Sequence, residues 1–183
     1  MCFPSFARCW SVLLVLACTG CFVPGTYYDP FDDYVRGLRE YDRGNCLMAE
    51  KIWARLANEN DCDAQARLGL LYLEGCHGNG DSRKARILLE RAAERGHPKG
   101  MIYFAALLVD NSSSGVDGAT LEKAYMLATL GARMASYDGE ASAANKVLNF
   151  LTQHMTQNQM NNATDFAAKW RPIDNACRPR KLL

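Results

Sequence analysis

The chain has 183 residues, 49% of them hydrophobic, which is enough for one folded domain with a core and excludes a disordered chain. Its 21 Lys and Arg residues nearly balance its 20 Asp and Glu residues, so the basic stripe of a nucleic-acid-binding protein is not indicated. The three histidines, His77, His97 and His154, are far apart in sequence. We therefore expect no metal site and no cofactor.

Residues 1–20 have the order of a secretory signal peptide: one cation, a run of apolar residues, and then small residues before a cysteine. The apolar run is shorter than the ~20 residues that cross a bilayer. The end of this segment resembles a bacterial lipobox, in which the cysteine after the cleavage site is acylated. We favour Cys21 as that cysteine, with Cys18 as the alternative; a plain cleaved signal and an uncleaved anchor are the other interpretations. Residues 21–30 would then form a tether.

A repeat follows the tether. The segments 49–57 and 85–93 both begin and end with alanine at an offset of 36 residues. A third alanine-containing segment, 123–132, follows, in which Lys123-Ala124 lies 39 residues after Lys84-Ala85. Glycine-rich turns separate these segments. We predict an all-α protein of about eight helices. The predicted helices are 31–42, 46–59, 63–74, 83–95, 99–109, 121–135, 140–154 and 157–170.

Several predicted helices carry capping signals at their first residues. We expect Asp81 or Ser82 to cap the helix after the first glycine-rich turn, and Thr120 to cap the helix after the serine-rich loop. Thr156 with Gln159 makes a capping box for the last helix.

Gly69 lies in the middle of a predicted helix, where glycine costs about 1 kcal/mol relative to alanine. We expect the next helix to approach its backbone closely. Leu68 and Tyr72 flank Gly69 on the face that we predict to be buried. Leucine at position 69 should therefore destabilise the fold by about 1–3 kcal/mol through overpacking.

Small and apolar residues recur at fixed places in the repeat and are expected to have structural roles. They are Ala64, Leu68, Gly69, Tyr72, Gly75, Ala85, Ala92 and Ala93, with Gly96 and His97 in the following turn. This pattern resembles the Sel-one-like repeat family, which is related to the tetratricopeptide repeats. The resemblance covers residues 31–172, is most specific at 64–97, and leaves 173–183 as a C-terminal tail. It implies a right-handed α-solenoid of antiparallel helix pairs, with a helix-turn role for His97.

Four cysteines lie beyond the signal segment, and an even number in an exported chain indicates disulfides. Cys46 opens one predicted helix and Cys76 follows its antiparallel neighbour, so both should lie at the same end of the hairpin. Cys62 should lie ~20 Å away at the other end, beyond the reach of about 7 Å for a disulfide. We predict Cys46–Cys76 and, by elimination, Cys62–Cys177; free buried cysteines are the alternative.

The first helix of each pair would form the concave face of a solenoid, where a partner could bind. Tetratricopeptide geometry carried onto this chain places ten residues there. The candidate partner-binding residues are Asp63, Ala66, Leu70, Leu73, Glu74, Lys99, Ile102, Ala106, Val109 and Asp110. The alternative is that Leu70, Leu73 and Val109 belong simply to the core.

No Ser-x-x-Lys, Gly-x-Ser-x-Gly or Walker motif occurs in the sequence, and we expect no enzymatic activity. The resemblance implies an exported, lipid-anchored scaffold or adaptor that binds another envelope protein or peptide, with no nucleic acid and no small-molecule substrate. Because the residue directly after Cys21 is Phe22 and not an acidic residue, we expect the outer membrane, with the domain facing the periplasm. The alternatives are a purely structural periplasmic part and a periplasmic enzyme of the cysteine-rich type that binds or hydrolyses β-lactams.

Overall fold

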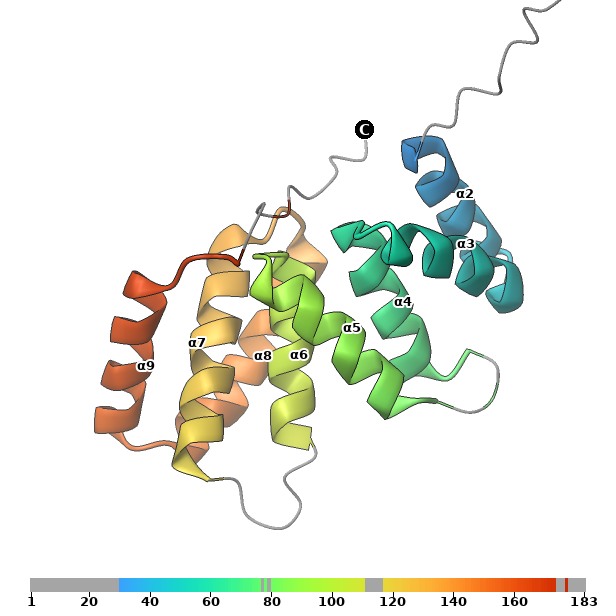
Figure 1. The fold of residues 1–183 in the computed structure, drawn as a ribbon. Helices are drawn as coiled ribbons and strands as arrows, with labels where there is room; N and C mark the ends of the chain where they lie inside the picture. Colours follow the sequence, from blue (N-terminus) through green and yellow to red (C-terminus); the bar gives the residue numbers. More distant parts are fainter. Residues whose placement is uncertain (1–29, 77, 79, 111–116, 174–176, 178–183) are drawn as a thin grey trace, which may run out of the picture. The chain divides into compact units, whose positions relative to one another are not determined.

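Eight α-helices and no strand make up the part of the chain that a computed structural model describes (Figure 1). The described residues are 30–76, 78, 80–110, 117–173 and 177. The all-α prediction is therefore confirmed. The helices are α2 (Pro30–Asp42), α3 (Cys46–Asn58), α4 (Cys62–Glu74), α5 (Ser82–Glu94), α6 (Pro98–Asp110), α7 (Gly118–Met134), α8 (Asp138–His154) and α9 (Gln157–Lys169).

The features predicted for the N-terminus lie outside the described residues. These are the signal peptide at 1–20, the lipid-attachment candidates Cys18 and Cys21, and all but the last residue of the tether at 21–30. Among the helices that the structure describes, none has both the length and the apolar character that crossing a bilayer requires. Residues 32–183 belong to a single unit.

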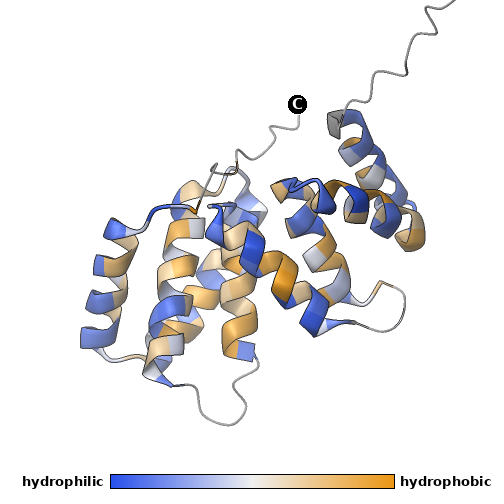
Figure 2. Cartoon of the chain, viewed as in Figure 1, coloured by the Kyte–Doolittle hydropathy of each residue, from blue (hydrophilic) through white to orange (hydrophobic). Residues whose placement is uncertain are grey.

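Helices that follow one another in the chain pack against each other from α3 through α8, and α9 packs on α7. Alternate helices also meet, since α4 contacts α6 and α6 contacts α8. This neighbour-on-neighbour pattern fits a helical repeat. Figure 2 shows apolar residues over much of α6, which contacts four other helices, and polar residues over most of α9.

Glycine allows the closest helix approaches, as predicted for Gly69. A Cβ atom at Gly69 would lie 2.7 Å from Cγ of Leu89 and 3.4 Å from the carbonyl oxygen of Ala85, both on α5. The same device recurs at Gly100, where a Cβ would lie 2.9 Å from the backbone nitrogen of Ala93. Small residues on both sides thus set how closely α5 approaches α4 and α6.

The core has two clusters of buried side chains. One joins α2, α3 and α4 around Trp53, which is 1% exposed and donates a hydrogen bond to the carbonyl oxygen of Tyr34 at 3.4 Å. The larger cluster joins α5 to α9 around Phe104 and Leu151. Tyr72 packs against both clusters, so this repeat residue connects the two halves of the core.

Both predicted disulfides are present, with Cα atoms 5.9 Å apart in each. Cys46–Cys76 joins the first residue of α3 to the residue after the α4 C-cap, Gly75. Cys62–Cys177 joins the first residue of α4 to the C-terminal tail across 115 positions of sequence.

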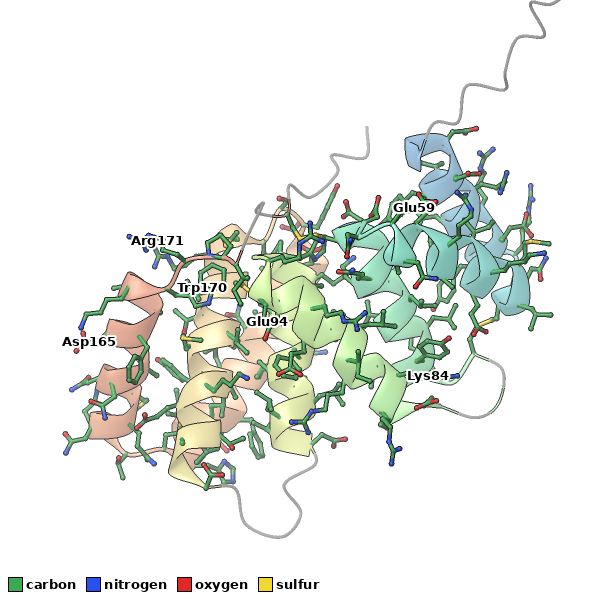
Figure 3. The ribbon with its side chains drawn as sticks, viewed as in Figure 1. Glu59, Lys84, Glu94, Asp165, Trp170 and Arg171 are labelled. Atoms are coloured by element: carbon green, nitrogen blue, oxygen red, sulfur yellow. A yellow bond between two sulfur atoms is a disulfide. The ribbon has the colours of Figure 1, made fainter. Side chains whose placement is uncertain are left out.

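The tail runs back from α9 to the end of α5. The backbone N–H of Ile173 donates to the carbonyl oxygen of Glu94 at 2.9 Å. The backbone N–H of Cys177 donates to the carbonyl oxygen of Arg95 at 2.8 Å. The Trp170 ring lies beside Gly96, whose φ is +85°; Figure 3 labels both Trp170 and Glu94. We call residues 170–173 together with Cys177 the strap, because they tie the last helix to the second helix pair.

Candidate functional site

A cavity of about 600 Å³ lies among the second halves of α4, α6 and α8. These are the helices predicted to be the first of successive pairs. The lining residues are Leu73 from α4, Ala106, Leu107, Val109 and Asp110 from α6, and Lys146, Val147 and Phe150 from α8.

The spacing of residues along each helix explains why these side chains meet. Ala106, Val109 and Asp110 are three or four positions apart, as are Lys146 and Phe150, so each set shares one helix face. The small side chain of Ala106 leaves room on the α6 wall. Phe150 stays 42% exposed and stacks on the imidazole of His154, with ring centroids 4.2 Å apart. The cavity thus has an apolar wall that is partly open to solvent.

Four of the ten predicted partner-binding residues line this cavity: Leu73, Ala106, Val109 and Asp110. Leu73 and Val109 also pack against the larger core cluster, so they both support the fold and form the wall. Three others make polar contacts elsewhere. These residues are Asp63, which contacts the turn residue His97, Glu74, which accepts from Tyr41, and Lys99, which pairs with Glu140.

Three predicted residues are buried instead of facing a partner. Ala66 and Ile102 are 0% exposed, and Leu70 is 9% exposed. Ile102 is covered because α7 approaches α6 closely: a Cβ at Gly131 would lie only 2.6 Å from Cγ1 of Ile102. These side chains therefore contribute to helix packing, and they are unsuitable for testing a binding surface.

His97 and Asp63 form a buried structural pair. Nε2 of His97 lies 3.0 Å from Oδ1 of Asp63, and Nδ1 accepts a hydrogen bond from the backbone N–H of Gly100 at 3.2 Å. His97 thereby caps the first turn of α6 and links it to α4. Because both ring nitrogens are engaged, the pair holds a helix turn in place and is not arranged to activate a nucleophile.

The first halves of α6 and α8 are joined by an ion pair. Nζ of Lys99 lies 3.4 Å from Oε1 of Glu140, and the side chains are 14% and 9% exposed. Burial lowers the pKa of Lys99, and the nearby Arg67 lowers it further, while Glu140 and Asp63 oppose this shift. Lys99 is thus part of the packing between helices and not a free surface cation.

The α8 side of the cavity was missed by reasoning from sequence. Lys146, Val147 and Phe150 were not predicted, because the predicted partner-binding residues were taken only from the two helices that became α4 and α6. A further step of 40 residues from Ala106 and Asp110 leads to Lys146 and Phe150. Applying the repeat once more would have found them.

Comparison of the chain with protein-family models, with curated proteins and with solved structures found no match. Within the described ranges, no group of three His, Cys, Asp or Glu side chains is placed to hold a metal ion. The function is therefore inferred from the geometry and chemistry of the α4–α6–α8 cavity.

Proposed function

We propose that this protein is an exported adaptor that holds a peptide segment of another envelope protein in the α4–α6–α8 cavity, without chemical turnover. The observation that carries the proposal is the cavity itself, with apolar walls from three helices and the partly exposed Phe150 at its edge. Apolar side chains that enter such pockets supply most of the affinity in protein–protein interfaces. A segment of a partner protein would bury the exposed face of Phe150.

The two disulfides support an oxidising compartment for the mature protein. Together with the signal-like first 20 residues, they favour export. We further propose acylation at Cys21, residence at the outer membrane with the domain facing the periplasm, and membership of the Sel-one-like repeat family with its right-handed solenoid. The matching offsets of the helix pairs are the basis for that family assignment.

The test is capture of crosslinked partners from cell envelopes with the wild-type chain and the Phe150→Ser variant. Phe166→Ser is the matched control, because Phe166 is a 57% exposed aromatic residue on α9 that does not line the cavity. We expect Phe150→Ser to lose a specific partner that the wild type and Phe166→Ser retain. Circular dichroism should show that all three are equally helical. Equal capture by all three proteins would rule out the cavity as the binding site.

A further inference from the structure

The charges around the cavity point to a particular kind of peptide. On the basis of the proposed function, we propose that the bound segment carries a basic side chain next to its apolar anchor, and that this basic side chain pairs with Asp110. An acidic group on the other side of the anchor pairs with Lys146.

The apolar part of the cavity defines the anchor. Six of the eight lining residues are apolar: Leu73, Ala106, Leu107, Val109, Val147 and Phe150. A leucine, methionine or aromatic side chain of the partner would bury its surface there, and Phe150 could stack on an aromatic ring. Such burial provides affinity but does not fix the direction of the peptide, which the charged residues must do.

The helix ends at the cavity are unusually negative for this protein. Six of the eight described helices have a basic residue in the last turn, where it offsets the partial negative charge of the helix C-terminus. The two without one are α4 and α6, and each ends in an acid, Glu74 and Asp110. Both helices contribute to the cavity. A basic group on the partner would supply the missing charge.

The two acids differ in their availability. Glu74 accepts a hydrogen bond from the hydroxyl of Tyr41, and this bond raises the pKa of Tyr41 to about 12. Asp110 is exposed and lines the cavity. Asp110 is therefore the acid that a partner's lysine or arginine would meet.

The α8 wall has the opposite charge. Lys146 is exposed, lines the cavity, and lies one helical turn before Phe150. An acidic side chain or a terminal carboxylate of the peptide would pair with it. With a base toward α6 and an acid toward α8, the peptide would bind in one direction, because the reversed peptide would place like charges together.

The experiment is selection of binders from a random twelve-residue peptide display library with the full mature chain. We expect enriched peptides to carry Lys or Arg close to a large apolar residue. Asp110→Lys should weaken binding of the best synthetic peptide by about three- to tenfold, which is the scale of one partly exposed charge pair. Replacing the peptide's base by Glu should restore affinity for Asp110→Lys. The matched control is Asp165→Lys on α9, an exposed acid outside the cavity lining (Figure 3), which should leave affinity unchanged.

Two outcomes would overturn the inference, and they can be told apart. In the first, the selected peptides fail to bind Phe150→Ser but have no preference for basic residues and bind Asp110→Lys normally. This result would disprove the charge pairing and keep the cavity as the binding site. In the second, the selected peptides bind Phe150→Ser as well as the wild type. This result would disprove both the charge pairing and the proposed function.

Discussion

At the scale of single residues, the helix crossings depend on positions that have no side chain. The hydrogen of Gly100 faces α5 so closely that a Cβ would lie 2.7 Å from Cβ of Ala92 and 2.9 Å from the backbone nitrogen of Ala93. At Gly69, by contrast, the nearest atom is Cγ of Leu89, a side chain that can shift. Contact with backbone is the harder constraint, since a whole helix would have to move.

We expect Gly100→Ala to lower the free energy of unfolding by about 1–3 kcal/mol, because overpacking outweighs the gain in helix propensity. Gly139→Ala is the matched control: Gly139 is also helical, and a Cβ there would meet nothing within 4 Å. That variant should be neutral or more stable by up to about 1 kcal/mol. Urea unfolding curves measure both, and equal stability of the two variants would contradict the role assigned to Gly100.

At the scale of helices, side chains just outside each helix decide where it begins. The predicted start of α7 at 121 is three residues late, because Asp117 and not Thr120 is the cap: Oδ1 of Asp117 accepts from the backbone N–H of Thr120 at 2.8 Å. Asp81 caps α5, one of the two residues predicted. The capping box of Thr156 and Gln159 is confirmed. Aspartate and threonine are both favoured N-cap residues, so when both occur near a helix start only the structure shows which of them is the cap.

Thr156→Ala should destabilise the protein by about 1 kcal/mol, since it removes the acceptor for the first turn of α9. Thr164→Ala is the control within the same helix, because Thr164 is exposed and its hydroxyl donates to the carbonyl oxygen of Met160 at 2.8 Å. That change should be neutral or slightly stabilising, because alanine is the better helix former. Thermal unfolding reports the difference, and amide hydrogen exchange should quicken in the first turn of α9 for Thr156→Ala. Unchanged exchange there would disprove the capping role.

At the scale of the whole molecule, the strap joins parts that are far apart in sequence. The Cys62–Cys177 disulfide closes a loop across 115 positions of the chain, and the Cys46–Cys76 disulfide closes a loop across 30. The chain-entropy model gives a long closed loop the larger stabilisation, about 5 kcal/mol against about 4 kcal/mol here. The strap's backbone hydrogen bonds to Glu94 and Arg95 add to this constraint.

We therefore expect the Cys62→Ser and Cys177→Ser double variant to lose more stability than the Cys46→Ser and Cys76→Ser double variant. Removing both cysteines of a pair avoids leaving one of them as an unpaired thiol that could form a wrong disulfide. Denaturant midpoints in non-reducing buffer measure the difference, and reduction of the wild type should lower its midpoint below that of either variant. A larger loss for the shorter loop would show that local packing, and not loop closure, sets the effect.

The sequence by itself determined the helical class, the approximate positions of the helices and the Cys46–Cys76 pair, because these follow from local periodicity, capping residues and helix length. Cys62–Cys177 followed only by elimination. It also identified Gly69 as a close-approach position. Tertiary structure alone decided which residues of the predicted partner face are accessible. Ala66 and Ile102 have the same spacing as Leu73 and Val109, yet they are fully buried. Periodicity defines a helix face, but the neighbouring helices decide how much of that face they cover, and this depends on contacts between residues distant in the chain.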